Sequence, residues 1–213
     1  MAKILAIIPA RANSKGVPGK NKMKLNGISL VDHAFNVANA SKYIDDIVIT
    51  TDDVDIINSF KNKNVKINKR KKSLSTDDSP IVDTINYIIN DYDDEYDFLL
   101  LLQPTSPIRS TNDLDKCILK LLNSPEINSI ISVCRMDDVH PGRMYWLLEN
   151  STIESVLDKY EETRRQDNKP VYFRNGSIYL TRTKSFKKNN SMMEQPIHPY
   201  IMDSEFLLNI DSH

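Results

Sequence analysis

The sequence predicts an α/β fold in which a mostly parallel sheet is covered by helices on both faces. Short apolar runs that indicate buried strands alternate with longer segments whose apolar residues recur at helical spacing. This order requires crossover connections, which place successive strands side by side and parallel. The chain has 213 residues, 40% of them hydrophobic, so it can bury one substantial core. We therefore expect a single domain over residues 1–213.

Strands are expected where apolar residues run without a helical period. These runs lie at 4–8, 47–50, 65–67, 98–102 and 129–134. Helices are expected between them, at 30–40, 54–60, 81–90 and 114–122. Thr111-Asn112-Asp113 has the composition of an N-terminal cap for the last helix. The lysine- and asparagine-rich stretches at 61–72 and 184–190 are expected to be solvated turns.

The alternation fails between Arg135 and Pro170, where charged residues mix with aromatic ones. We expect an insertion at about 135–170 with short strands of its own. A return strand follows over 171–180, interrupted at Asn175-Gly176. Within the insertion, Tyr145-Trp146 is an expected interface anchor, because aromatic residues are enriched at interface cores.

The loop after the first strand has the composition of a phosphate site. Between Pro9 and Asn21 it carries Arg11, Lys15 and Lys20 among small residues. The carboxyl end of a parallel strand is the usual ligand position in an open α/β sheet, and small residues let backbone N–H groups approach phosphate oxygens. The loop has neither the Walker A pattern nor the dinucleotide fingerprint. A lysine-rich surface loop without a ligand is the alternative.

Five blocks of sequence together resemble the sugar nucleotidyltransferases, in the form of the acylneuraminate cytidylyltransferases. The blocks are I-P-A-R-A-N-S-K-G with K-N in the first loop, R-K-K-S-L-S-T-D at 70–77, L-Q-P-T-S-P-I-R at 102–109, R-R-Q at 164–166 and R-N-G-S-I-Y at 174–179. They follow the order of the family. The resemblance implies a Rossmann-like nucleotidyltransferase fold and a homodimer, with the insertion used in dimerisation.

The resemblance implies that the first two blocks bind a nucleotide. Transfer of a phosphoryl or nucleotidyl group depends on alignment and charge stabilisation, so Arg11 and Lys20 are the expected catalytic cations, acting on the departing pyrophosphate. Asn21 could instead be a simple turn residue. Arg70 could instead belong to a solvated cluster of lysines. The expected nucleotide-binding set is Ala10, Arg11, Lys15, Lys20, Asn21, Arg70 and Ser79.

The later blocks are expected to bind a sugar acid. A carboxylate is best recognised by a bidentate guanidinium, which Arg supplies and Lys does not. We therefore expect Arg165 to face the carboxylate of the sugar, with Gln166 beside it. Arg109 is expected to be structural. The remaining expected sugar contacts are Gln103, Ser106, Asn175 and Tyr179.

The last segment is where the family carries acidic residues for Mg²⁺. Here it reads Leu208-Asn209-Ile210-Asp211-Ser212-His213. Asp211 fits the family pattern and is the expected catalytic metal ligand, since Mg²⁺ bridges carboxylates to substrate phosphates. Asn209 occupies a position that is acidic in some relatives and offers only a neutral oxygen. This departure, with the early end of the segment, leaves open a nucleotide-binding regulator without turnover.

Composition argues against several other classes of protein. The net charge is −1, from 28 basic and 29 acidic residues, so there is no overall basic field for nucleic acid. No apolar stretch reaches the roughly 20 residues that span a bilayer, and the first residues do not form a secretory signal. Cys117 and Cys134 are expected to be buried, reduced thiols of a cytoplasmic protein.

The sequence thus predicts an enzyme that uses CTP and Mg²⁺ to activate a nine-carbon 2-keto sugar acid, of sialic or legionaminic type. Its products would be the CMP-sugar and pyrophosphate. Guanylyl or other nucleotidyl transfer to a sugar phosphate stays open, because a few hydrogen bonds decide which base is chosen.

Overall fold

Strand β1 (Ile4–Pro9) shows how the central sheet is covered. In the computed structural model, Ile4, Ala6 and Ile8 pack into one buried cluster, whereas Leu5 and Ile7 pack into another. Because alternate side chains of a strand point to opposite faces, the two clusters are the two faces of the sheet. The structure describes residues 2–210 apart from 13–15, 77, 93–94 and 158–168.

The large sheet has seven strands in the order β11-β7-β10-β6-β1-β4-β5. Within this sheet β10 runs antiparallel to both of its neighbours, β6 and β7, whereas the other neighbouring pairs are parallel. The predicted mostly parallel α/β fold is therefore confirmed. Besides β1, the strands are β4 (Asp46–Thr51), β5 (Lys66–Lys69), β6 (Phe98–Leu101), β7 (Ser129–Met136), β10 (Val171–Arg182) and β11 (Ile197–Met202).

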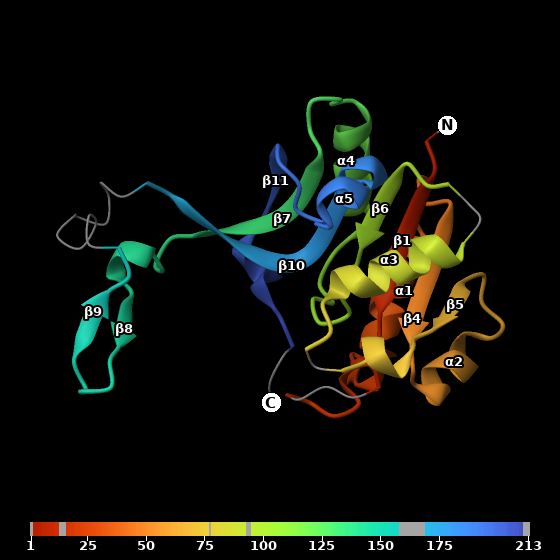
Figure 1. Cartoon of the computed structure of the whole chain (residues 1–213), viewed down its shortest axis with the longest axis horizontal. Helices are drawn as coiled ribbons and strands as arrows, with labels where there is room; N and C mark the ends of the chain where they lie inside the picture. The colour runs from red at the N-terminus through yellow and green to blue at the C-terminus, as the bar shows by residue number, and fades with distance from the viewer. Residues whose placement is uncertain (1, 13–15, 77, 93–94, 158–168, 211–213) are drawn as a thin grey trace.

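Helices cover both faces of this sheet (Figure 1). They are α1 (Leu30–Asn39), α2 (Val54–Phe60), α3 (Ile81–Asp91), α4 (Thr111–Leu122) and α5 (Thr183–Asn189). Helices α1, α2 and α4 pack on the face that holds Ile4, while α3 and α5 pack on the face that holds Leu5. None of the helices in the described part of the chain is long and apolar enough to cross a membrane.

The fold differs from the sequence prediction in several details. The stretch at 61–72 is not simply a solvated turn, because it contains strand β5. The cap of α4 is Ser110, one residue earlier than expected, because Ser110 and Asp113 form a reciprocal capping box. The stretch at 184–190 is not a solvated turn, since most of it is helix α5, held down by the fully buried Phe186. Strand β11 was not anticipated because it contains Pro199, which a sheet tolerates at its edge.

The described part of the chain also contains smaller elements. A two-stranded hairpin joins β2 (Lys24–Leu25) to β3 (Ile28–Ser29) through Asn26 and Gly27, both at positive φ. The Asn-Gly pair is the sequence signal for this turn. Short 3₁₀ helices are η1 (Lys20–Lys22), η2 (Lys72–Leu74), η3 (Pro141–Arg143) and η6 (Ser204–Leu207).

The insertion forms an arm, residues 140–157, that stands away from the main sheet (Figure 1). It contains η3 and an antiparallel hairpin of β8 (Tyr145–Leu147) and β9 (Ile153–Ser155). The prediction that the insertion has short strands of its own is confirmed. Several of its large apolar side chains are exposed to solvent, among them Trp146 at 60% and Leu147 at 78%. An exposed apolar surface of this kind typically marks an interaction site.

Candidate active site

A cavity of about 300 Å³ opens beyond the carboxyl ends of β1, β5 and β6. This edge is where ligands bind in open α/β sheets. Three separate predicted blocks meet there, together with the segment that follows η6. The predicted residues in its wall are Arg11, Lys20, Asn21, Arg70, Ser79 and Gln103.

The wall is rich in cations that are partly or fully removed from water. Lys20 is only 8% exposed, and Arg70 is buried as well. The Arg11 guanidinium donates to the carbonyl of Thr76 at 2.9 Å. Water screens the field of a buried cation less than that of a surface cation. The cationic wall therefore suits a polyanionic ligand.

Burial explains the electrostatics of Arg70. It lowers the pKa of Arg70 to about 10 because the charged form loses hydration; Asp52 opposes this effect and Arg11 adds to it. The guanidinium is held by the hydroxyl and the carbonyl of Thr50, both at 3.3 Å. The flanking residues Lys69 and Lys71 are exposed. Arg70 is therefore not part of a solvated lysine cluster, which excludes that alternative.

Two residues of the first loop are also fixed by the surrounding backbone. Asn21 lines the cavity, and its amide donates to the Arg11 carbonyl at 2.9 Å. Ala10 is fully buried: its N–H donates to the Thr50 carbonyl at 2.9 Å, and its own carbonyl accepts from Thr51 Oγ1 at 2.5 Å. Ala10 thus joins the loop to β4 and is absent from the cavity wall, so its contact with a nucleotide stays a prediction.

Ser79 reaches the cavity from the loop before α3. Its hydroxyl donates to the Ser73 carbonyl at 2.9 Å and lies 2.6 Å from Thr76 Oγ1. Thr76 and Thr84 also line this side of the cavity, although sequence reasoning did not single them out. The available signal was position, because Thr76 lies within the second block and Thr84 follows it.

Arg109 fixes the loop that carries Gln103. Its buried guanidinium donates to the carbonyls of Ser106 (Nε at 3.0 Å), Ser177 (Nη1 at 2.6 Å) and Gln103. Burial lowers its pKa to about 9. The predicted structural role of Arg109 is confirmed, because it ties the loop after β6 to β10 and leaves the Gln103 side chain on the cavity.

The other predicted sugar contacts point inward. Ser106 donates to the Asn175 carbonyl at 3.0 Å. The Asn175 side chain accepts from Ser132 Oγ at 2.6 Å and donates to the Phe206 carbonyl at 3.2 Å. Tyr179 is 9% exposed and packs in the core on the α3 face. The structure does not bring these three side chains into the cavity wall, because internal partners occupy them; direct contact with a sugar stays a prediction.

Four predicted site residues lie outside the described part of the chain: Lys15, Arg165, Gln166 and Asp211. The predicted metal region is therefore described only in part. Asn209 lines the cavity, and the next N–H, that of Ile210, donates to the Thr105 carbonyl at 2.8 Å. Among the residues that the structure does describe, no group of three His, Cys, Asp or Glu side chains is placed to hold a metal. The side chain of Asn209 carries an amide oxygen, a hard donor of the type that Mg²⁺ accepts.

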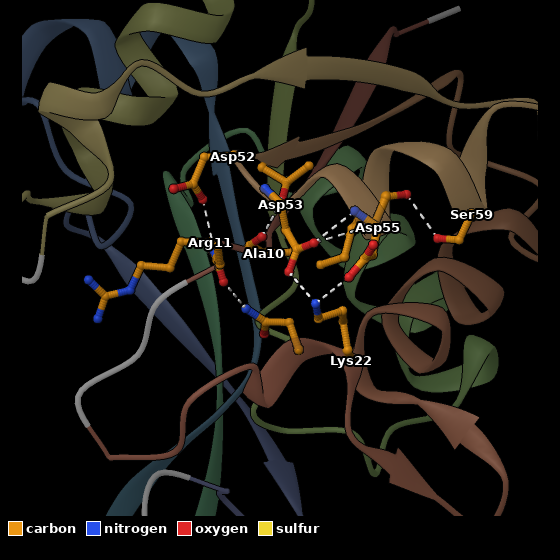
Figure 2. Close-up of polar contacts among 11 residues, drawn as sticks. Ala10, Arg11, Lys22, Asp52, Asp53, Asp55 and Ser59 are labelled. Carbon is orange, nitrogen blue, oxygen red and sulfur yellow. Dashed lines mark hydrogen bonds and ion pairs between the residues drawn. The ribbon is translucent and has the colours of Figure 1, made fainter.

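Sequence reasoning missed one acidic residue beside the first loop. Asp52 Oδ1 accepts the Ala12 N–H at 2.7 Å (Figure 2). The available signal was its place directly after β4, whose carboxyl end adjoins that of β1.

The chain is similar in sequence to several known proteins. A family model described as Cytidylyltransferase matches residues 5–205. The chain belongs to the cytidylyltransferase family. A CMP-N,N'-diacetyllegionaminic acid synthase of Legionella pneumophila is 30% identical over 215 residues, covering 95% of this chain and 88% of the relative. This family match does not favour the guanylyl transfer that the sequence had left open.

A second relative and a solved structure are also similar to this chain. An N-acylneuraminate cytidylyltransferase of Streptococcus agalactiae is 29% identical over 212 residues, covering 99% of this chain. The chain spans about half (51%) of that relative's length. The solved structure of a CMP:2-keto-3-deoxy-manno-octonic acid synthetase with CTP matches at a TM-score of 0.73 and 15% identity, over 99% of this chain and 94% of the other. At that identity the match establishes the cytidylyltransferase fold alone.

Proposed function

We propose that this member of the cytidylyltransferase family transfers the CMP group of CTP to a nine-carbon 2-keto sugar acid of sialic or legionaminic type. The observation that carries the proposal is the cavity where Arg11, Lys20, Asn21 and Arg70 meet Gln103 at the carboxyl edge of the sheet. The names of the two relatives supply the class of sugar acid.

The reaction replaces one bond to phosphorus by another. The anomeric hydroxyl of the acid gives up its proton to solvent as its oxygen attacks the α-phosphorus of CTP. The bond from that phosphorus to the oxygen bridging to the β-phosphate breaks, and pyrophosphate leaves with its negative charge. Arg11 and Lys20 hold the phosphates and stabilise that charge. Lys20 is buried, so its field is less weakened by water than that of a surface lysine. Lys15 is proposed as a third phosphate ligand.

The nucleoside half of CTP lies toward Arg70 and Ser79 in this proposal. Arg70 is fixed by Thr50, so it needs no reorganisation to meet a ligand. Asn21 keeps an oxygen available for a ribose or base hydrogen bond while its amide nitrogen holds the loop.

The sugar acid lies toward Gln103 in this proposal. Arg165 pairs with the carboxylate of the acid, and Gln166 contacts the acid beside it. Asn175, Ser106 and Tyr179 support this side of the site through β10 and the loop after β6.

The C-terminal segment carries a carboxylate and an amide, which are oxygen donors of the kind that Mg²⁺ binds. When bound, it would neutralise part of the triphosphate charge. We propose that Asp211 supplies the carboxylate and Asn209 a neutral oxygen from the cavity wall. The Ile210–Thr105 hydrogen bond anchors the segment between them to the loop after β6.

We also propose a homodimer that uses the arm. Tyr145 and Trp146 are exposed there, and burying them against a second copy would remove apolar surface from water. Cys117 and Cys134 are both buried free thiols, which supports a cytoplasmic location.

The decisive experiment measures pyrophosphate release. The chain is mixed with CTP, Mg²⁺ and either N-acetylneuraminate or N,N'-diacetyllegionaminate, with reactions lacking the sugar as the blank. Replacing CTP by GTP, UTP or ATP tests the choice of base. We expect release with CTP and one of the acids. A chain that binds CTP but releases no pyrophosphate with either acid would favour the regulator without turnover.

A further inference from the structure

A carboxylate outside the predicted site residues holds the backbone of the first loop. Asp52 Oδ1 accepts the Ala12 N–H at 2.7 Å, and this pair is partly buried. Ala12 directly follows Arg11, whose side chain lines the cavity. We propose that Asp52 is a positioning residue for phosphate binding, acting on Arg11 through the Ala12 N–H. The consequence for CTP binding rests on the proposed function; the consequence for the loop does not.

The residues before Asp52 hold the other side of Arg11. Thr50 accepts the Ala10 N–H at 2.9 Å, and Thr51 Oγ1 donates to the Ala10 carbonyl at 2.5 Å. The end of β4 therefore fixes the backbone on both sides of Arg11 (Figure 2). Of these three hydrogen bonds, only the one that Asp52 accepts from Ala12 is charge-assisted, which makes it the strongest.

The end of the first loop is attached to the segment where β4 ends and α2 begins. The Lys22 ammonium lies 2.7 Å from Asp55 and 3.1 Å from Asp53 (Figure 2). Hydrogen bonds to Asp55 and Asp53 raise the pKa of Lys22. Lys22 belongs to η1, which also contains Lys20 and Asn21. Carboxylates at one junction thus anchor the loop at Ala12 and again at Lys22.

The negative charge of Asp52 lies close to the proposed phosphate site, where it is unfavourable for an anionic ligand. It repels a triphosphate bound by Arg11, so charge alone would make Asp52 unfavourable for CTP. The hydrogen bond to Ala12 offsets that cost by ordering the loop before the ligand arrives. Asp52 also favours the charged form of Arg70, which burial opposes.

Two substitutions of Asp52 separate the effect of its oxygen's position from the effect of its charge. Asp52→Asn keeps an oxygen for the Ala12 N–H and removes the charge. Asp52→Glu keeps the charge and displaces the oxygen by one methylene. The matched control is Asp45→Glu, because Asp45 accepts the Ile4 N–H at 2.7 Å, also partly buried, at the opposite end of β1.

Two measurements on the full chain test the proposal. Hydrogen exchange without ligand follows peptides that contain Ala12, and calorimetry measures the Kd of CTP with Mg²⁺. In Asp52→Glu we expect faster exchange at Ala12 and a Kd about tenfold weaker, the scale of losing one hydrogen bond to a charged group. Asp52→Asn should keep the slow exchange and bind within about threefold of wild type. Asp45→Glu should lower Tm without changing the Kd.

The outcomes discriminate between the two accounts. If Asp52→Glu exchanges and binds like wild type while Asp52→Asn binds CTP more tightly, Asp52 acts by charge alone and the proposal is overturned. Unchanged exchange at Ala12 in Asp52→Glu also overturns it. If wild type fails to bind CTP, the proposed function is wrong, while the exchange data still decide whether Asp52 orders the loop.

Discussion

Substitution of Gly176 tests how closely β10 packs against the loop that carries Gln103. Gly176 has a φ of +77°, a conformation that costs a residue with a side chain about 1–2 kcal/mol. A methyl group there would lie 2.9 Å from Ser106 Oγ and 3.2 Å from Gln103 Oε1. Ser106 has little room to retreat, because it is buried and bonded to the Asn175 carbonyl.

These contacts set the magnitude for Gly176→Ala. Adding the backbone cost to about 1 kcal/mol for the lost Ser106 hydrogen bond gives a destabilisation of about 2–3 kcal/mol. For a chain of this size, that lowers Tm by about 4–12 °C. Displacement of Gln103 should also raise the KM for the sugar acid. Thermal unfolding followed by circular dichroism measures the first effect, and initial rates of pyrophosphate release measure the second.

Gly27 provides the matched control. Its φ is +82°, yet a methyl group there would meet nothing within 4 Å. Gly27→Ala should therefore show the backbone cost alone, about 1–2 kcal/mol, with unchanged KM. If Gly176→Ala is no less stable than Gly27→Ala and keeps its KM, β10 does not constrain Gln103 and the reasoning is refuted.

Three further predictions concern groups proposed to meet substrate. Replacing Arg11 or Lys20 by Ala should lower kcat by about tenfold to a hundredfold, the scale of losing one preorganised donor, and normal turnover of Arg11→Ala would contradict its role. Arg165→Lys should raise the KM for the acid with the Kd of CTP unchanged, whereas equal weakening of both would place Arg165 at the phosphates. Asp211→Ala should abolish activity at ordinary Mg²⁺ with partial recovery in excess metal, and Asn209→Asp should tighten Mg²⁺ binding in a titration; a full rate in Asp211→Ala would remove it from the metal site.

The elements that sequence analysis located well are those whose signal is local. The helix expected at 81–90 runs from Ile81 to Asp91, and the helix expected at 54–60 has those same bounds. Their apolar spacing matches one buried face, so period alone suffices. Helix α5 lacks that signal, because Phe186 is its one large buried side chain among lysines and asparagines.

The site was predictable where a residue's position along the chain decides its location. Arg11, Arg70 and Gln103 each come shortly after a strand of the parallel part of the sheet, and they line one cavity because parallel strands end at one edge. The inward orientation of Asn175 was not predictable. It depends on Ser132 and Phe206, which are distant in sequence and arrive only when the sheet and the C-terminal segment assemble.

The length of β10 has a mechanical consequence. The strand pairs with β7 from Val171 opposite Met136, near the arm, to Thr181 opposite Ser129, in the core. One ladder of hydrogen bonds therefore carries any force on the arm into the sheet. The pairing shifts register between Arg174 and Tyr179, where Gly176 of β10 lies against the loop of Gln103. A single strand thus links the arm to the loop that lines the cavity at Gln103.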